Sequence, residues 1–254
     1  MSCNKVLRVA ADGSGDFRTV QEAVDAVPFS NRTRTVIQVA PGVYRQPVYV
    51  PKTKDFITLA GSCPDTTVLT WDNTASRIDH HQSPLVIGTG TFGCGSTIVE
   101  GEDFIVENIT FENSAPQGSG QAVAIRVTAD RCAFYNCRFD PCRCIITGNG
   151  GTSYAFLGRP WGPFARVVFA YTWMDCCIRP FGWHNWDKSE NERSACFYEY
   201  RCSGPGCCLT NRVAWSRELL DDEAGSFISH PFVDPDPDRP WLAQKMAVRI
   251  PYSA

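Results

Sequence analysis

Residues 157–161, Leu-Gly-Arg-Pro-Trp, place a fixed cation next to an indole between glycine and proline. The planar guanidinium of Arg159 can meet a carboxylate with a fork of donors, and Trp161 offers a flat apolar face. Proline restricts the backbone between them, so we expect a small rigid site. A carbohydrate or uronate ligand would use both groups. The same residues also fit an arginine stem packed on a core tryptophan.

The charge and composition of the chain limit the classes of binding partner that we expect. The chain has 254 residues and a net charge of −3, and no run of Lys and Arg exceeds two. Nucleic acid and anionic membranes are therefore not expected as partners. No apolar run approaches the length of a membrane span, and the first residues contain no apolar core of a secretory signal.

Cysteine is frequent, and its count of 13 is odd. We expect free thiols that fill a β core, because several cysteines lie inside strand-like runs. Two adjacent pairs, at 176–177 and 207–208, invite a metal interpretation. Neither pair has zinc-site spacing, and the four histidines show no matching pattern, so we expect no metal and no cofactor.

The elements that must position this site are mostly short strands. One helix is expected after a capping box of Thr19 and Glu22, with an apolar stripe that could cover the open end of a β structure. Strand-like runs without intervening long helices disfavour a sheet built from βαβ units. They fall at residues 6–10, 36–39, 48–50, 56–60, 68–71, 104–111, 123–127, 132–139, 154–157, 167–173, 195–200 and 213–215.

A weak internal repeat suggests how these strands stack. Residues 107–111 resemble residues 135–139 through a shared N-x-x-F, offset by 28 positions, which lies in the range of solenoid units. Strands stacked coil on coil would leave one outer face as a long cleft. A β-sandwich remains open from these runs alone. We expect one domain, residues 1–254, with a solenoid over 30–230. We expect an extended tail over 231–254, whose prolines between 231 and 240 exclude a helix or a central strand.

The chain resembles the plant pectin methylesterases, carbohydrate esterases that remove methyl groups from polygalacturonate. The match covers nearly the whole chain, and the stretches around Gln121 and Arg159 are its specific part. The matching stretches, in order, are residues 12–17 with 19–20, 42–44, 120–126, 157–161, 182–183 with Trp186, 204–206 and 212–215.

This resemblance implies an all-β fold, a right-handed parallel β-helix, which agrees with the solenoid interpretation. It implies a monomer that acts on methyl-esterified homogalacturonan and needs no cofactor. Gln121 would donate its amide to the oxyanion of the tetrahedral intermediate. Arg159 would orient the nucleophilic carboxylate, and Trp161 would contact the sugar. Without the motif, Gln121 would fit a buried amide in a polar ladder equally well.

One departure concerns the chemistry. The family hydrolyses the ester with two aspartates, and both of their motifs should lie between Gln121 and Arg159. Instead, residues 140–144 join the strand at 134–139 directly to residues 145–149. About two or more coils are missing, a loss that a solenoid tolerates because each coil mainly contacts its neighbours. Asp140 fits a turn aspartate at this junction, and Asp175 fits a surface position.

Three interpretations remain. The first is a pectin methylesterase whose catalysis is impaired or abolished. The second is an inactive paralogue that binds polyuronides or is structural, and the third is a splice or gene-model product of a longer enzyme. A serine hydrolase is disfavoured because no G-x-S-x-G elbow occurs. A metal-dependent lyase is disfavoured by the lack of clustered acidic residues. The family acts on cell walls, whereas no secretory signal is visible, so localisation stays open.

Overall fold

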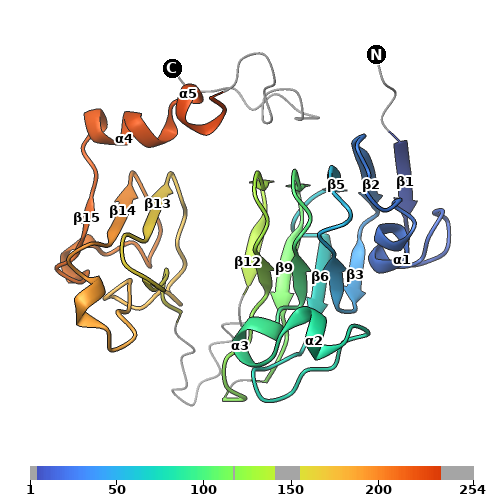
Figure 1. The fold of residues 1–254 in the computed structure, drawn as a ribbon, viewed down its shortest axis with the longest axis horizontal. Coiled ribbons are helices and arrows are strands. Elements are labelled where there is room, and N and C mark those ends of the chain that lie inside the picture. The colour runs from blue at the N-terminus through green and yellow to red at the C-terminus, as the bar shows by residue number, and fades with distance from the viewer. Residues whose placement is uncertain (1–4, 117, 141–154, 236–254) are drawn as a thin grey trace. The chain divides into compact units, whose positions relative to one another are not determined.

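A computed structural model describes residues 5–116, 118–140 and 155–235, apart from the side chains of Asp140 and His230 (Figure 1). The backbone divides into two compact units, Met1–Arg143 and Cys144–Ala254, and each is described by itself. Short strands predominate in both units. The prediction of a single domain over residues 1–254 stays a prediction.

Parallel strands in three sheets build the first unit. Their bounds are β1 Lys5–Val9, β2 Thr35–Val39, β3 Gly42–Arg45, β4 Val48–Val50, β5 Ile57–Gly61, β6 Thr67–Trp71, β7 Thr97–Val99, β8 Ile105–Glu107, β9 Thr110–Asn113, β10 Ile125–Val127, β11 Ala133–Tyr135 and β12 Arg138–Asp140. The sheet orders are β1-β2-β5-β8-β11, β12-β9-β6-β3 and β10-β7-β4. Successive coils add one strand to each sheet, so the predicted parallel β-helix is confirmed.

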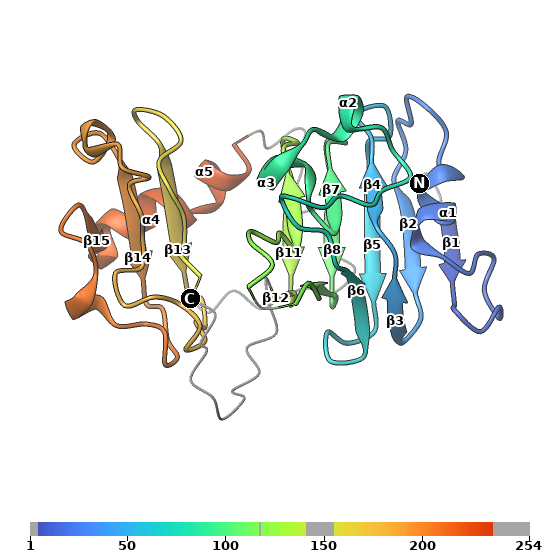
Figure 2. The same cartoon turned by 90° about the horizontal axis from the view of Figure 1, so that it is seen from below.

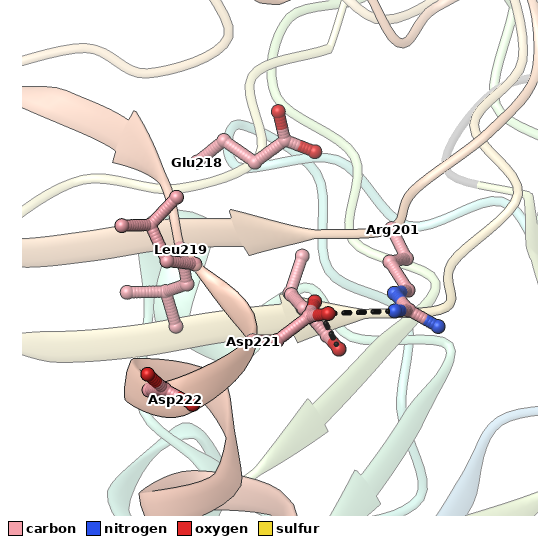
Figure 3. A pocket seen from close by; sticks show the side chains of 7 residues that line it. Arg201, Glu218, Leu219, Asp221 and Asp222 are labelled. Carbon is pink, nitrogen blue, oxygen red and sulfur yellow. Dashed lines mark hydrogen bonds and ion pairs between the residues drawn. The ribbon is translucent and has the colours of Figure 1, made fainter.

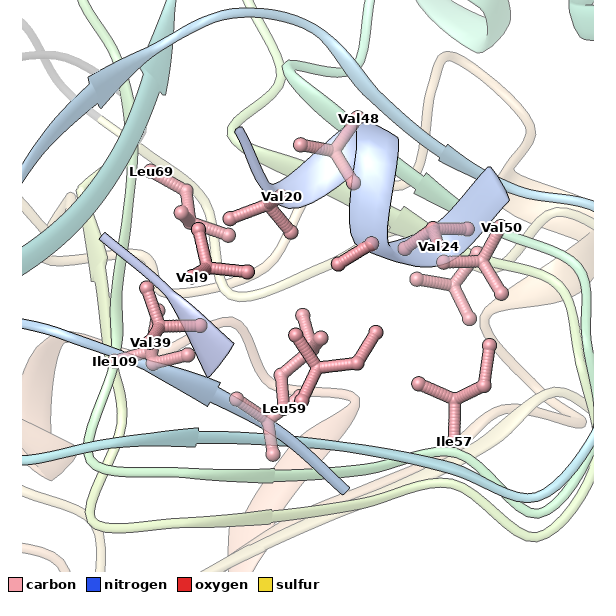
Figure 4. Packing of buried hydrophobic residues seen from close by; sticks show 14 of the residues in the cluster. Val9, Val20, Val24, Val39, Val48, Val50, Ile57, Leu59, Leu69 and Ile109 are labelled. Carbon is pink, nitrogen blue, oxygen red and sulfur yellow. The ribbon is translucent and has the colours of Figure 1, made fainter. Parts of the chain in front are cut away.

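Inward side chains stack in ladders along the axis of this unit. In the first sheet Leu7 pairs with Ile37, Ile37 with Leu59, and Leu59 with Val106. Ile37, Leu59 and Val106 are fully buried. Because parallel pairing puts the same position of each coil at the same place, one apolar residue per strand yields a continuous core (Figure 4).

The 28-residue repeat is a structural repeat. Glu107 pairs with Tyr135, and Thr110 with Arg138, in adjacent coils. Each predicted run, 104–111 and 132–139, contains two strands, because its asparagine turns the chain. Asn108 and Asn136 have φ of 58° and 49°, a left-handed conformation that asparagine tolerates better than most residues.

These corner asparagines are also hydrogen-bonded to each other. Asn136 Nδ2 donates to Asn108 Oδ1 at 2.8 Å, and Asn108 Nδ2 donates to the carbonyl of Gly61 at 3.3 Å. A Cβ on Gly61 would lie 2.4 Å from the carbonyl oxygen of Asn108, so the preceding coil needs glycine at this point. The repeated asparagines thus form a hydrogen-bonded ladder at one corner of the solenoid.

The expected helix is α1, Val20–Asp25, and it covers the N-terminal end of the core. Its capping box is present, with the Glu22 amide donating to Thr19 Oγ1 and the Thr19 amide donating to Glu22 Oε2. Val20 and Val24 are fully buried in the same cluster as the strand residues (Figure 4). The prediction that its apolar stripe closes the open end is confirmed.

Two short helices, α2 Pro84–Ile87 and α3 Gly90–Gly93, were not predicted. The segment that carries them covers the outer side of the sheet formed by β4 and β7 (Figure 2). Ile87 and Ile98 are both fully buried there and pack with Tyr49. Ile98 of β7, which faces outward, is therefore shielded from solvent by apolar side chains.

The second unit contains the parallel strands β13 Arg166–Ala170, β14 Cys196–Tyr200 and β15 Ser216–Glu218. Two 3₁₀ turns, Ser189–Asn191 and Leu209–Asn211, precede β14 and β15. A buried ion pair ties the loop before β15 to β14, since Arg212 Nε lies 2.7 Å from Glu199 Oε1 and both side chains are only 3% exposed. Removing either partner would leave a buried charge without its neighbour.

Three local predictions fail in this unit. Residues 155–157 of the run at 154–157 form no strand, and Ala155 makes only an isolated bridge with Ile178. The run at 213–215 is not a strand, because β15 begins one residue later. Pro231 lies inside a short helix, α5 His230–Val233, that follows α4 Asp221–Ile228. Proline is tolerated in the first turn because the amide it lacks would have no helical partner there. The rest of the predicted tail, from residue 236 on, lies outside the described residues.

Candidate functional site

Gln121 belongs to the first unit and is solvent-exposed four residues before β10. Its carbonyl oxygen accepts the Ala75 amide at 2.8 Å, so its backbone is held by the preceding coil. The interpretation as a buried amide in a polar ladder is therefore wrong. Within the part of the chain that the structure describes, the carboxamide of Gln121 has no hydrogen-bond partner, and it is available to a ligand.

Buried amides fix the strand entry next to Gln121. Asn113 is fully buried, and its Nδ2 donates to the carbonyls of Val123 at 3.0 Å and Asn73 at 2.9 Å. The Asn73 side chain in turn accepts the Asp79 amide at 2.7 Å. The bond from Asn113 to Asn73 joins adjacent coils, whereas the other two bonds lie within a coil. The bond to Val123 holds the backbone two residues after Gln121 in place.

Arg159 and Trp161 belong to the second unit, and the structure brings both against Trp186. The Trp161 and Trp186 rings lie 4.8 Å apart, edge to face, and the Arg159 guanidinium lies 5.9 Å from the Trp186 ring. The same guanidinium lies 5.4 Å from the Phe156 ring. Arg159, Trp161, Trp186 and Phe156 are called the aromatic cluster below. Its rings and cation offer the groups that a uronate needs.

The exposure of this cluster decides between the two sequence interpretations. Trp161 is 67% exposed and Trp186 is 45% exposed, so neither indole is a core residue on which an arginine stem packs. Arg159 is exposed as well. Among the described residues, no carboxylate lies within ion-pair distance of Arg159. A surface cation beside two open indoles is typical of a binding surface, and the packing interpretation is wrong.

Backbone hydrogen bonds from distant coils position the Arg159 segment. The Leu157 amide donates to the Gly182 carbonyl at 2.7 Å, and the His184 amide donates to the Gly158 carbonyl at 3.2 Å. Asn191 Nδ2 reaches the Pro160 carbonyl at 3.3 Å. A Cβ on Gly158 would lie 3.2 Å from the Trp183 ring, so glycine at this position allows close packing. Arg159 thus extends from a rigid backbone.

Trp186 was not predicted as a site residue, and a strained turn presents it. Trp186 and Asp187 have φ of 58° and 57°. Side chains before the turn hold it, because His184 Nδ1 accepts the Trp186 amide at 2.9 Å and Asn185 Oδ1 accepts the Asp187 amide at 3.0 Å. Two consecutive left-handed residues cost free energy and persist where the surroundings determine them. His and Asn two residues before such positions were the signal in the sequence.

The remaining candidates supply no carboxylate to this surface. Asp140 ends β12, and its side chain lies outside the described residues. Asp175 is exposed and accepts the amide of Cys176 at 2.6 Å, as expected for a surface turn. Gln121 lies in the first unit, so each unit contributes its candidate residues separately.

A cavity elsewhere in the second unit has a different, acidic lining (Figure 3). It measures about 480 Å³ and is lined by residues of β14, β15 and the start of α4. Arg201 NH2 lies 3.0 Å from Asp221 Oδ2, and the Tyr200 hydroxyl donates to Asp221 Oδ1 at 3.0 Å. Desolvation, with that carboxylate, raises the pKa of Tyr200 to about 12. With Glu218 and Asp222 also present, the lining is acidic and unsuited to a polyanion.

The described residues were compared with the requirements of a metal site and of a membrane span. In residues 5–116, 118–140 and 155–235, no three His, Cys, Asp or Glu side chains group closely enough to hold a metal ion. Ten cysteines in those ranges are free thiols. No helix in the described part of the chain is long and apolar enough to cross a membrane.

Comparison with known protein families identifies relatives of this chain. The family model described as Pectinesterase matches residues 6–147 and again residues 142–236. The chain is 57% identical to Pectinesterase 31 of Arabidopsis thaliana over 317 aligned positions, which cover 100% of both chains. It is 31% identical to Pectinesterase QRT1 of the same plant over 90% of this chain and 77% of that one.

Solved structures give the same result. The carrot pectin methylesterase has a TM-score of 0.64 and 27% sequence identity, covering 92% of this chain and 94% of that one. A pectin methylesterase variant in complex with a hexasaccharide has a TM-score of 0.58 and 19% identity, covering 92% and 97%. At that identity, the second likeness concerns the fold alone.

Proposed function

Because the chain belongs to the pectinesterase family of carboxylic ester hydrolases, we propose that its ligand is methyl-esterified homogalacturonan, the polyuronide of pectin. A solved pectin methylesterase variant of the same fold is in complex with a hexasaccharide. The proposed partner is thus a sugar chain, which binds to a monomer.

The single observation that carries this proposal is the exposed aromatic cluster. Trp161 and Trp186 present apolar faces on which pyranose rings can stack, and Arg159 adds a cation for a uronate carboxylate. Proteins seldom expose adjacent large aromatic side chains without a ligand or a partner to cover them. The cluster therefore supports recognition of a sugar acid.

The reaction expected of the family is hydrolysis of the methyl ester, which yields a free carboxylate and methanol. We propose that this chain has lost that reaction. Its alignment with Pectinesterase 31 spans 317 positions, although the chain has 254 residues, so the alignment leaves gaps in this chain. The two family-model matches meet at residues 142–147, between Gln121 and Arg159. Both aspartate motifs are expected in that interval.

Oxyanion stabilisation without a nucleophile gives little turnover. In this proposal Gln121 keeps its donor, which is worth about 100- to 1000-fold in rate where the rest of a site is intact. No carboxylate joins it in the part of the chain that the structure describes. The chain would then be a pectin-binding member of an enzyme family.

The test is methanol release from highly methylated pectin by purified protein that is folded and monomeric. We expect release no faster than from buffer alone. Release that disappears in the Gln121→Ala variant would show that carboxylates outside the two family motifs rebuild the site, and the proposed loss of activity would be wrong. A full-length relative measured beside it shows that the assay works.

A second candidate is a splice or gene-model product, and the meeting point of the two family matches favours it equally. Sequencing of transcripts across codons 139–145 separates the two. If every message contains the direct junction, the protein is naturally shortened; messages both with and without an additional segment there indicate a splice product. If every message carries an additional segment there, the working protein is longer, and the loss of activity belongs to this sequence alone.

A further inference from the structure

Residues 78–94, called the strap below, cross the outer face of the sheet formed by β4, β7 and β10 (Figure 2). The two helices of the strap, α2 and α3, have four residues each. Helices this short have little stability of their own and depend on packing. Tyr49, Ile98 and Arg126 lie side by side on the covered face, in register across the three strands. The strap therefore depends on its contacts with this face.

Apolar packing and a cation–π contact hold the strap on the sheet. Ile87 of α2 is fully buried with Ile98 and Tyr49. The Phe92 ring of α3 lies 3.9 Å from the guanidinium of Arg126. Release of the strap would expose these groups and leave the core of the coils intact. Such a local opening needs less free energy than unfolding of the whole unit.

His80 belongs to the strap, and its ring has no place for a second proton. The ring lies edge-on to Tyr49, with 6.3 Å between centroids, and stacks on His81 at 4.4 Å. Its Nδ1 accepts the Gln82 amide at 3.0 Å, so the neutral ring carries its proton on Nε2. Nε2 is buried, and no described residue accepts a hydrogen bond from it. A second proton on Nδ1 would break the bond to Gln82 and leave a cation without an acceptor.

The carboxylate of this layer is already occupied. Glu100 Oε1 accepts from Arg126 Nη2 at 2.8 Å, and Glu100 Oε2 accepts from the Tyr49 hydroxyl at 2.9 Å. Desolvation and the hydrogen bond to Glu100 raise the pKa of Tyr49 to about 12, so the hydroxyl remains a donor at every pH considered below. Glu100 therefore stays with Arg126 and Tyr49 when the pH falls.

The other charged neighbours of His80 do not neutralise it either. Asp25 of α1 favours the charged form of His81, whose own pKa burial lowers. Asp79, next to His80 in the chain, is exposed to solvent. A protonated His81 would repel a protonated His80 at stacking distance. A charged His80 is thus better accommodated in a released strap, where water solvates it.

The strap also contacts the backbone of Gln121. Cys94, the last residue of the strap, directs its thiol at the Gln121 carbonyl oxygen at 3.8 Å. The same oxygen accepts the amide of Ala75, three residues before the strap begins, at 2.8 Å. Both ends of the strap are therefore linked to the strand entry at Gln121.

We propose that the strap is a proton-operated cover: protonation of His80 releases residues 78–94 from the sheet and loosens the backbone of Gln121. In the closed strap, burial lowers the pKa of His80 to about 4, and His81 adds to this effect. In the released strap a solvated ring has the ordinary value of 6.5. Release therefore takes up a proton between pH 6.5 and 4 and becomes more favourable as the pH falls through this range. The cover rests on the fold alone and does not depend on the proposed function.

Amide hydrogen exchange of the unchanged protein, followed by NMR at pH 7 and pH 5, tests the cover. Each rate is divided by that of an unstructured peptide at the same pH, which removes the pH dependence of the exchange chemistry. We expect the protection of residues 84–93 to fall about 20-fold at pH 5, from the difference between the two pKa values. Strands β2 and β5 should keep their protection. An unchanged strap overturns the proposal, and so does an equal fall in strap and strands, which would be global unfolding.

Two variants identify the group that takes up the proton. His80→Phe keeps an aromatic ring against Tyr49 but cannot be protonated, so the protection of the strap should be the same at pH 7 and pH 5. His81→Phe is the matched control, because it keeps a stacked ring at the neighbouring position and should retain most of the fall. A fall that persists in His80→Phe and disappears in His81→Phe would overturn the proposal.

The Ala75 amide reports the link to Gln121. We expect it to lose protection together with the strap in the unchanged protein. A strap that opens at pH 5 while the Ala75 amide stays protected would refute the effect on Gln121. These measurements need no ligand. Loss of the cover would leave the proposed function standing, and absence of pectin binding would leave the cover standing.

Discussion

At the scale of single residues, the binding surface depends on side chains that the fold leaves open. Trp161 and Trp186 are exposed, and their edge-to-face contact holds each ring in one orientation. A ring that is already ordered loses little conformational entropy when a ligand stacks on it. The pair therefore favours binding more than two separate surface tryptophans would.

Trp161→Ala should weaken binding of oligogalacturonides by about 1 kcal/mol, roughly fivefold, because one stacking face is lost. Isothermal titration calorimetry with a defined oligomer measures the change. Trp173→Ala is the matched control, since Trp173 is 63% exposed in the same unit and does not contact the cluster. Equal affinity of the Trp161→Ala variant and the unchanged protein would remove Trp161 from the site.

His80 makes stability depend on pH. Burial lowers its pKa to about 4, with a further contribution from His81, whose ring stacks on it at 4.4 Å. Burial also lowers the pKa of His81, which Asp25 opposes. Below pH 6.5 His80 becomes protonated in the unfolded chain but stays neutral in the folded protein. The free energy of unfolding should therefore fall as the pH drops from 6.5 to 4.

Urea unfolding at pH 7 and pH 5 measures this dependence. In His80→Phe the ring remains and the titrating group is gone, so the loss of stability between the two pH values should be smaller than in the unchanged protein. For each protein, the free energy of unfolding at pH 7 is the reference for its value at pH 5. An identical pH dependence in both proteins would assign the effect to other groups.

At the scale of elements, the corners of the coils are specified as closely as the strands. Asn108 and Asn136 turn the chain in left-handed geometry and hydrogen-bond across adjacent coils. A corner ladder therefore fixes the register of stacked coils.

Asn108→Ala should lower the free energy of unfolding by about 2 kcal/mol, because two hydrogen bonds are lost and alanine tolerates positive φ less well than asparagine. Asn108→Gly should cost about 1 kcal/mol, since glycine accepts that backbone and only the hydrogen bonds are lost. Urea unfolding compares the two. Equal costs would mean that backbone geometry is not what asparagine supplies at this corner.

At the scale of the whole molecule, a solenoid can lose coils and still fold. Each strand in the first unit pairs with strands of the adjacent coils, so a shorter stack keeps the same local contacts. Phe139 lies in β12, the last strand of its sheet in the first unit, where it stacks on Phe111 at 5.8 Å and is 46% exposed.

Far-UV circular dichroism should show β structure that melts in one cooperative transition, as expected for a single domain of coupled coils. A thermal scan monitored at two wavelengths measures this. Phe139→Ala should lower the melting temperature, because the last coil loses its stacked aromatic ring. Two separate transitions would mean that the two compact units unfold independently, and the single-domain prediction would be wrong.

Much of the architecture could be read from local patterns. The Thr19 capping box, the alternation of short strands and the 28-residue repeat depend on residues close in sequence, or on the same pattern one coil later. Periodicity carries such information because each coil contacts only its neighbours. The family was indicated separately, by the resemblance of the stretches around Gln121 and Arg159 to known motifs.

What the sequence determined by itself was the type of each part: parallel coils, a capped helix, and a cation beside an indole. Only the tertiary structure decided which groups meet. Trp186 meets Trp161, and Trp183 is buried against Phe169 and Phe197, because adjacent coils bring together residues that are far apart in the sequence. The short helices α2 and α3 also depend on tertiary contacts, because their stability comes from packing against an apolar face of the sheet.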